Sequence, residues 1–347
     1  DLPWFLQALR PQGYLGRLFA RNLAQKLSAP NDPLRWQADD ILSALLHTAG
    51  SSPGDLVLGD HALEDELQFT RILVMSIPMT PIEFHGRFPS IAQSFEKSGP
   101  RGSSAAGERP KFFTSRLIHQ DNLENLIVKF VRIDPDNPAT LRWGDLLLCE
   151  EMALHVLAVH DMSSATTETV NVEDWLFLQS TRFDRTSHGG RIGIFDLDTL
   201  DAAFAGSDRS NWLAGALPLH AQGMIDADDI DTIRLLDAFG RLIGNDDMHH
   251  GNLSFFAEPE NERLKLAPVY DMLPMHYRPS PTGLTHDRPF TLPQPDRTHI
   301  AMWEKAGEMA AAFWTAAAAD PRLSADFAAI CAGNAERISA WRSEHGL

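Results

Sequence analysis

The apolar residues of the chain follow two spacings, one typical of helices and one typical of strands. Residues 4–27 have apolar positions three and four residues apart, with a Pro and Gly turn at 11–13, so we expect two short helices there. The same spacing predicts longer helices over four further stretches, at residues 142–160, 226–244, 301–319 and 323–343.

Strands are expected mainly before residue 185. Residues 54–63 and 67–77 are predicted to be short strands or strand ends. Residues 125–133 are β-branched and apolar around a single charged side chain, Lys129, which is typical of a central strand. Residues 173–185 alternate enough to predict another strand. The first half of the chain is therefore expected to be strand-rich and the second half helical.

Two segments are predicted to be irregular. The Gly/Ser-rich residues 96–115 contain nothing that could anchor them in a core, so we expect a mobile loop flanked by strands. Residues 274–295 hold six prolines, which exclude a long helix there.

Composition then narrows the class of protein. A chain of 347 residues with 44% hydrophobic content is long enough for two or three packed subdomains. It has no apolar run of about 18 residues and no signal-peptide pattern, so we expect a cytoplasmic protein without a membrane partner. The chain opens at Asp1 without Met, which suggests a fragment or a processed form.

Charge and cysteine content narrow the partners. The net charge of −17 argues against direct nucleic-acid binding by this segment and favours a basic partner. The two cysteines, Cys149 and Cys331, cannot build a disulfide framework. Each lies in an apolar, helix-like stretch, so we expect two buried thiols.

The stretch "GNDDMHHGN", residues 244–252, carries the densest candidate chemistry. Phosphoryl transfer requires a carboxylate beside the acceptor hydroxyl, oxygen ligands for Mg²⁺ and a cation on the nucleotide phosphates. Asp247 and Asn252 stand in the spacing D-x-x-x-x-N of a kinase catalytic loop. Asp271 follows a short apolar run in "LAPVYDML", and Lys129 lies within a predicted strand where a charge is otherwise unfavourable.

Each of these residues has a simpler interpretation when it is taken alone. The 244–252 stretch could be a solvated turn, Lys129 could lie on an edge strand, and Asp271 could cap a helix. His249 and His250 could bind a transition metal with nearby carboxylates. Adjacent histidines in an extended loop point in opposite directions, however, so we expect one of them to hold the loop through hydrogen bonds.

The order of five motifs resembles the bacterial HipA-type toxin serine/threonine kinases, and within them the YjjJ (HipH) branch. The motifs are "GSSAAGERPKF", "IVKF", "RFDR", "NDDMHHGNLSFF" and "LAPVYDML", and the resemblance covers roughly residues 1–290. It implies an α+β, two-lobed, protein-kinase-like fold with a strand-rich N-terminal lobe and a helical C-terminal lobe. The implied domains are a HipA-like subdomain (1–85), a nucleotide-binding N-lobe (86–185) and a catalytic C-lobe (186–347).

The resemblance also implies a role for individual residues. Asp247 would be the catalytic carboxylate, and Asn252 and Asp271 would hold Mg²⁺. Lys129 would pair with the ATP phosphates. The remaining ATP-binding residues would be the hinge and ribose residues Thr181, Arg182, Phe183 and Asp184, and the loop residues Ser104, Ala105, Ala106 and Gly107. Ser104, or its neighbour Ser103, would be the autophosphorylation site that inactivates the enzyme.

Some positions depart from the family pattern or stay open. Thr181 stands where the family commonly has Glu, and Pro110 removes a backbone donor beside the loop. Either Glu150 or Glu151 could orient Lys129, and we favour Glu150, because helical spacing places it on the face shared by the apolar side chains. His249 is the histidine assigned to support the site.

The expected function is an ATP- and Mg²⁺-dependent serine/threonine protein kinase of a toxin–antitoxin type. The resemblance points to an aminoacyl-tRNA synthetase as protein substrate and to an antitoxin or helix-turn-helix protein as partner. One alternative is a metal-dependent hydrolase or nuclease that uses Asp246, Asp247, His249 and Asp271. Another is a catalytically weak pseudo-kinase that acts as a binding module.

Overall fold

The computed structural model of the chain describes residues 2–11, 13–47, 52–98, 109–119, 122–257 and 262–347. They form a mixed helix and sheet structure that divides into two compact units. Unit 1 comprises residues 1–130, 170–195 and 256–258, and unit 2 comprises residues 131–169, 196–255 and 259–347. The three consecutive domains inferred from the sequence remain a prediction.

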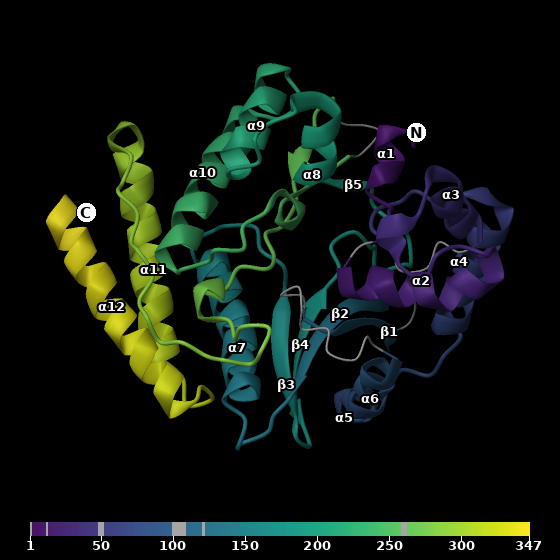
Figure 1. The fold of residues 1–347 in the computed structure, drawn as a ribbon, viewed down its shortest axis with the longest axis horizontal. Helices are drawn as coiled ribbons and strands as arrows, with labels where there is room; N and C mark the ends of the chain where they lie inside the picture. Colours follow the sequence, from purple (N-terminus) through teal and green to yellow (C-terminus); the bar gives the residue numbers. More distant parts are fainter. Residues whose placement is uncertain (1, 12, 48–51, 99–108, 120–121, 258–261) are drawn as a thin grey trace. The chain divides into compact units, whose positions relative to one another are not determined.

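Unit 1 begins with six helices (Figure 1). They are α1 (Trp4–Gln7), α2 (Gly13–Leu27), α3 (Ala38–His47), α4 (Gly59–Val74), α5 (Pro81–His85) and α6 (Phe88–Ser98). The two helices expected in residues 4–27 are confirmed as α1 and α2. Apolar residues from α1, α2 and α3 pack around the fully buried Trp36 and form the core of this region.

The strands predicted over residues 54–63 and 67–77 are wrong, because α4 covers the second half of the first stretch and most of the second, and no residue of either lies in a strand. Ala62, Glu66 and Leu73 recur at helical spacing and form the inner side of this helix, where Ala62 is fully buried. Short apolar runs do not distinguish helix from strand, and packing decided in favour of helix. The beginning of the chain is therefore more helical than expected.

A four-stranded sheet follows the six helices. Its strands are β1 (Lys111–His119), β2 (Asn122–Arg132), β3 (Thr167–Val172) and β4 (Trp175–Thr181). They pair in the order β1-β2-β4-β3, so β2 is an interior strand, as predicted. The Gly/Ser-rich stretch 96–115 is not flanked by two strands, because its first residues end α6 and its residues 111–115 begin β1; its residues 99–108 lie outside the described part of the chain. The expectation that nothing in this stretch could anchor it in a core is wrong, because Phe112 is fully buried.

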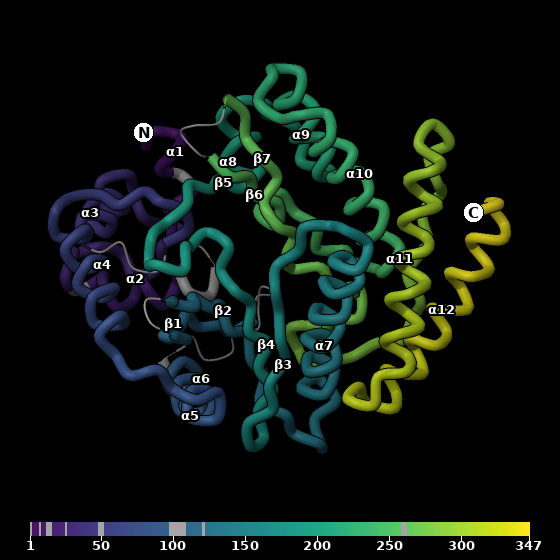
Figure 2. The backbone as a smooth tube through the Cα atoms, turned by 180° about the vertical axis from the view of Figure 1, so that it is seen from behind, coloured from purple at the N-terminus to yellow at the C-terminus, as the bar shows by residue number. Residues whose placement is uncertain are grey.

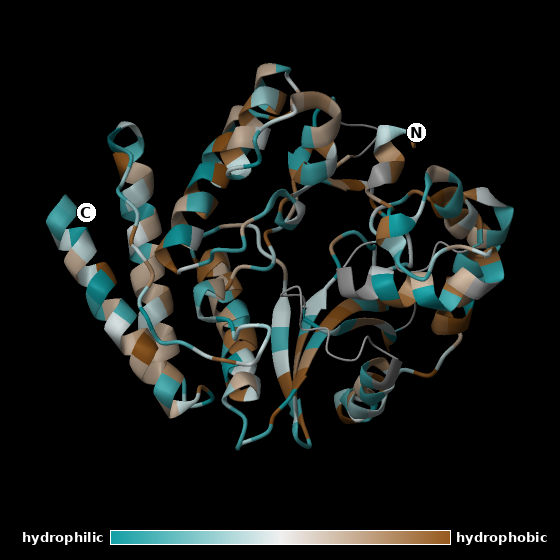
Figure 3. Cartoon of the chain, in the orientation of Figure 1, coloured by the Kyte–Doolittle hydropathy of each residue, from teal (hydrophilic) through white to brown (hydrophobic). Residues whose placement is uncertain are grey.

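An aromatic core fills the face of this sheet that α5 and α6 cover. It contains Phe84 and Phe88 from these helices, and Phe112, Phe130, Trp175 and Phe177 from the strands. Figure 3 shows the corresponding hydrophobic colours on the strands. Leu126, Val128 and Phe130 alternate along β2 toward this core, which places Lys129 on the opposite face of the sheet.

Unit 2 is mostly helical (Figure 2). Its helices are α7 (Pro138–Val159), α8 (Leu197–Leu200), α9 (Trp212–Ala221), α10 (Ala227–Leu242), α11 (Ile300–Ala319) and α12 (Ala325–His345). The helices predicted over 142–160, 226–244, 301–319 and 323–343 are thereby confirmed. A second, three-stranded sheet consists of β5 (Ile194–Asp196), β6 (Ser254–Phe256) and β7 (Lys265–Leu266), in that order.

The helix α7 is buried on more faces than an amphipathic pattern implies, because Arg142, Asp145 and Glu150 are buried with its apolar residues. Arg142 binds the proline-rich segment. Its guanidinium donates to the carbonyl oxygens of Tyr277 and His286 at 3.3 and 3.2 Å and pairs with Asp287 at 3.0 Å. The segment 274–295 is irregular, as expected, apart from 3₁₀ turns such as Met275–Tyr277.

The two cysteines are free and fully buried, as predicted. Burial raises the pKa of Cys149 on α7 well above its ordinary value, and the neighbouring Cys331 on α12 raises it further.

Candidate active site

The candidate catalytic loop begins where α10 ends. Gly244 has a φ of +74°, and a Cβ at this position would lie 2.8 Å from the ring of Phe290, so the turn out of the helix requires glycine. The following residues fold back on themselves. The Asn252 side-chain Nδ2 donates to the backbone oxygen of Asp247 at 3.0 Å. The two ends of the D-x-x-x-x-N spacing are thus brought together.

A third residue, Asn245, links the backbone of Asp271 to the backbone of Asp247. The Asn245 Oδ1 accepts a hydrogen bond from the backbone N–H of Asp247 at 3.1 Å. Its Nδ2 donates to the backbone oxygen of Asp271 at 3.3 Å. Asn245 is 6% exposed, and Asp271 has the left-handed φ of +54°. A buried amide therefore bridges the two segments that carry the acidic side chains.

Burial and nearby charges both shift the pKa of the Asp247 carboxylate. Burial is the main cause that raises the pKa of Asp247 above its ordinary value. The charges of Asp246 and Asp271 raise it further, whereas His249 and Arg278 lower it. Asp247 is half-buried, so it remains partly accessible from solvent.

The donor types around the loop suit a hard divalent cation. The bond from Nδ2 to Asp247 leaves the Oδ1 of Asn252 as the amide atom suited to bind a cation, and Asp271 contributes a carboxylate. Oxygen ligands of this kind are those that Mg²⁺ prefers. The residues expected to hold Mg²⁺ therefore fit that role by their chemistry.

The histidine that supports the loop through its ring is His250. His250 is 3% exposed, and its Nε2 bonds to the backbone oxygen of Asn211 at 2.8 Å. A Cβ on Gly215 would lie 2.8 Å from this ring, so α9 packs against it closely. The His249 side chain, which we had assigned to support, is exposed; its backbone oxygen accepts from Trp212 Nε1 at 2.9 Å. The loop orients its two rings oppositely, and sequence spacing cannot say which one faces inward.

Lys129 is 9% exposed on the interior strand β2. The alternative of an edge strand with a solvated ammonium group is therefore wrong. Of the two candidate glutamates, Glu150 is 1% exposed on the same buried side of α7 as Leu146. Glu151 accepts from the backbone N–H and hydroxyl of Thr169 at 2.6 and 2.9 Å and from Arg322. Because these bonds engage Glu151, Glu150 remains the candidate for orienting Lys129.

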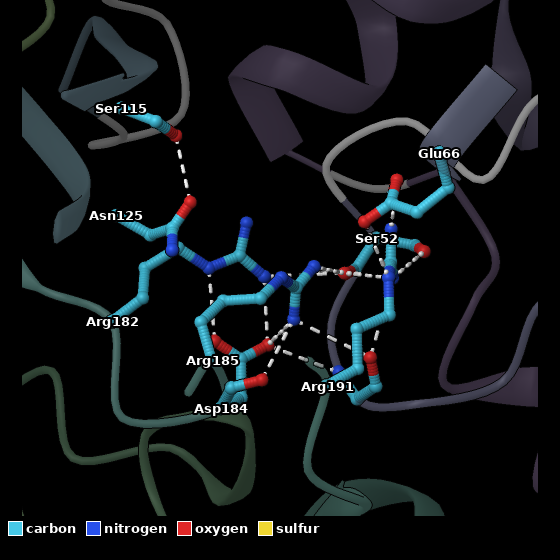
Figure 4. A network of polar contacts seen from close by, with 9 residues as sticks. Ser52, Glu66, Ser115, Asn125, Arg182, Asp184, Arg185 and Arg191 are labelled. Atoms are coloured by element: carbon cyan, nitrogen blue, oxygen red, sulfur yellow. Dashed lines mark hydrogen bonds and ion pairs between the residues drawn. The ribbon is translucent and has the colours of Figure 1, made fainter. Parts of the chain in front are cut away.

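The expected hinge follows β4, but Asp184 does not point to a ligand. Its carboxylate is 4% exposed and accepts hydrogen bonds from Arg182, Arg185 and the backbone N–H of Gly54, as Figure 4 shows for the side chains. These partners use both oxygens, so the structure argues against the ribose contact expected of Asp184. The guanidinium of Arg182 bonds to the Asp184 carboxylate. Thr181 and Phe183 are half-buried.

Comparisons with known proteins show the family to which these motifs belong. The family model of the HipA-like C-terminal domain matches residues 103–338, which is more than half of the chain. The chain belongs to the HipA-like family. A second model, the middle domain of YjjJ-like toxins, matches residues 1–67. The chain is also 34% identical to Toxin YjjJ of Escherichia coli (strain K12), over 97% of this chain and 74% of that protein.

Two solved structures are similar to this HipA-like chain at low identity. One is the Shewanella oneidensis MR-1 HipA, solved with HipB and operator DNA, at 16% identity and a TM-score of 0.35; it covers 62% of this chain and 57% of that one. The other is the Helicobacter pylori proinflammatory kinase CtkA, at 13% identity and a TM-score of 0.45, with 67% and 92% covered. The family-model matches and the 34% identity confirm the family resemblance, and the helices and sheets of the chain confirm the α+β fold class inferred from the sequence.

The metal-dependent hydrolase alternative finds no support in the described part of this HipA-like chain. No group of three or more His, Cys, Asp or Glu side chains among the described residues could hold a metal ion. Asp246, one of the four residues that the alternative requires, forms an ion pair with Arg278 instead. In the same ranges, no helix is long and apolar enough to cross a bilayer.

The expected loop residues are not among those described, and three residues at the site were not expected from the sequence. The loop residues Ser103, Ser104, Ala105, Ala106 and Gly107 lie outside the described residues. Asn245 and Arg278 were missed from the sequence. Tyr270 was also missed; its hydroxyl donates to the Gly251 oxygen and bonds Ser254, both at 2.8 Å. The sequence feature that could have indicated a role for Asn245 is its position two residues before Asp247.

Proposed function

We propose that the chain is an ATP- and Mg²⁺-dependent serine/threonine protein kinase of a toxin type. The observation that carries the proposal is the buried Asn245 bridge, which brings Asp247 and Asp271 together beside Asn252. Membership of the HipA-like family, and the printed name of the YjjJ relative, support a toxin role. The proposal includes a cytoplasmic location.

Asp247 is the proposed catalytic residue. Its carboxylate positions the acceptor hydroxyl and takes up its proton as the new O–P bond forms and the bond to the leaving ADP oxygen breaks. The raised pKa of Asp247 suits proton acceptance, because a more basic carboxylate binds the proton more strongly. Asn245 accepts a hydrogen bond from the backbone N–H of Asp247 and so holds the Asp247 carboxylate in position.

Asp271 and Asn252 are the proposed Mg²⁺ ligands, and Lys129 is the proposed partner of the nucleotide phosphates. The chemistry that Mg²⁺ supplies in such a site is neutralisation of charge on the phosphates. Thr181, Arg182 and Phe183 are proposed to flank adenine through their backbone atoms. Asp184 is omitted from the nucleotide contacts, because its oxygens are already bonded.

Regulation and partners belong to the same proposal. Phosphate on Ser104 or Ser103 would add negative charge to a loop that must approach ATP, and repulsion would favour the open form. A protein substrate, with an aminoacyl-tRNA synthetase as the candidate, and an antitoxin or helix-turn-helix partner follow from the family resemblance. The net charge of −17 fits a partner with a basic surface.

Labelled ATP in a bacterial lysate tests the activity. We expect the wild-type chain to transfer the γ-phosphate to at least one protein band when Mg²⁺ is present. Asp247→Ala and Asp271→Ala should both abolish the labelled band, whereas Asp231→Ala, at an exposed position on α10, should not. Equal labelling by wild type and Asp247→Ala would show that Asp247 has no catalytic role.

Mass spectrometry tests the regulation. Purified wild type should carry phosphate on the peptide that contains Ser103 and Ser104, and Asp247→Ala prepared alone should not. Phosphate on the inactive variant would mean that another kinase modifies the loop.

A further inference from the structure

A buried group of charged side chains follows the end of β4. The side chains of Arg182, Arg185 and Arg191 are 7%, 6% and 6% exposed. Two carboxylates lie among them, Asp184 and Glu66 (Figure 4). Buried guanidinium groups need hydrogen-bond acceptors, and backbone carbonyl oxygens supply several of them here.

The carbonyl oxygens come from a turn in the N-terminal part of the chain. The Ser52 oxygen accepts from Arg182, Arg185 and Arg191 at 3.2, 2.7 and 3.3 Å. Arg191 also donates to the Gly54 oxygen at 3.2 Å. In return, the Gly54 N–H donates to Asp184 at 3.0 Å, so bonds run in both directions between the turn and the arginines.

The turn and α4 hold this arrangement in a defined geometry. Gly54 has a φ of +73°, and a Cβ there would come within 3.3 Å of the backbone N and O of Ile194. Glu66 on α4 binds Arg191 with both oxygens, at 2.9 Å to Nε and 2.9 Å to Nη2. A paired fork of this kind fixes the direction of the guanidinium as well as its position.

The same arginines are continuous with the proposed hinge. Arg182 is a hinge residue, and its backbone N–H donates to the Asn125 oxygen of β2 at 2.8 Å. Its guanidinium lies 4.9 Å from the centre of the Phe113 ring. The ring of the next residue, Phe183, meets Phe256 edge-on at 5.9 Å. The hinge is thus held by the sheet on one side and by the charged group on the other.

Removal of one member would unbalance the rest. Burial, and then the charge of Arg182, lower the pKa of Arg185 to about 9, so the Arg185 cation already lies in an unfavourable environment. A buried charge that loses its partner moves or draws in water. Loss of the Glu66 charge would therefore displace Arg191, then the Ser52 oxygen that it shares with Arg182.

We infer that the Ser52–Gly54 turn and Glu66 position the nucleotide hinge, so that the N-terminal module sets the affinity for ATP. The inference rests on the proposed function. The YjjJ-like middle-domain match, residues 1–67, contains the turn and Glu66, whereas the HipA-like match, residues 103–338, contains the arginines. The two matched regions are therefore joined inside unit 1 by buried charge. A molecule that moves the turn would change nucleotide affinity without touching the nucleotide.

Glu66→Gln tests the inference in the full chain, because it removes one charge and keeps the shape. Glu64→Gln is the matched control, since Glu64 is exposed on the same helix. Titration with ATP and Mg²⁺ well below the melting temperature should give a dissociation constant about fivefold weaker for Glu66→Gln and unchanged for Glu64→Gln. In turnover, the KM for ATP should rise by the same factor while kcat stays unchanged.

The outcomes separate the inference from the proposed function. A lower melting temperature with an unchanged dissociation constant would show that Glu66 is only structural and would overturn the inference. Wild-type protein that binds no ATP with Mg²⁺ would overturn the proposed function and the inference together. If Glu66→Gln does not fold, Arg191→Lys replaces it in the same comparison, because it keeps the charge and loses the fork.

Discussion

Replacement of Asn245 by alanine should damage the site and the fold to different degrees. The substitution removes three hydrogen bonds, at 3.1 Å from the Asp247 N–H, at 3.3 Å to the Asp271 oxygen and at 3.6 Å to the Met272 sulfur. An unsatisfied buried polar group costs roughly 1–3 kcal/mol, and both backbone groups belong to half-buried residues that water can partly reach. We therefore expect a loss of about 2–3 kcal/mol in the free energy of unfolding.

The larger effect should be on turnover, because both acidic segments lose their shared anchor. A displacement of about 1 Å in a catalytic group can lower a rate by roughly a hundredfold. Denaturant unfolding and labelled-ATP turnover measure the two effects on one preparation. Asn334→Ala is the control: this buried amide donates to the Tyr277 hydroxyl at 2.9 Å, far along the chain from Asp247. Parental kcat in folded Asn245→Ala would refute the positioning role.

Three further predictions follow from single sites. Arg278→Met should move the acid limb of the pH–activity profile to higher pH, because Arg278 lowers the already raised pKa of Asp247 and activity is lost as the pH falls through that pKa. The control Arg297→Met should leave the profile unchanged. A shift to lower pH in Arg278→Met would contradict the assignment of Asp247. Gly54→Ala should reduce the melting temperature more than Gly206→Ala, because both have positive φ but a Cβ on Gly206 meets nothing within 4 Å; equal effects would refute the close-approach argument. Cys149 and Cys331 should react with a thiol reagent only after unfolding, and fast native labelling would contradict their burial.

The sequence predicted the elements whose own pattern is long and regular. The helices α7, α10, α11 and α12 and the interior strand β2 were recognised because burial imposes a repeating pattern on many residues. The helix α4 was missed because its outward side also carries apolar residues, among them Leu63, Leu67 and Ile72. Apolar residues on both sides of a helix obscure the period that separates helix from strand.

The candidate site was predictable where a motif states the spacing and unpredictable where tertiary contacts assign the role. Asp247 and Asn252 came from their spacing and Asp271 from its place after an apolar run. Asn252 bonds Asp247 directly, and Asn245 links Asp247 to Asp271. The bonds of Asp184 could not be inferred from its motif alone, since one of its partners, the Gly54 N–H, lies 130 residues earlier. Which of two neighbouring histidines faces inward likewise depends on α9, which packs against the loop.

The most direct measurement is transfer of the γ-phosphate from ATP by the purified chain with Mg²⁺, compared between wild type and Asp247→Ala. The account predicts a measurable wild-type rate that a metal chelator removes and that falls at least about a hundredfold in the variant, with both proteins folded. A variant that turns over ATP at the wild-type rate would contradict it.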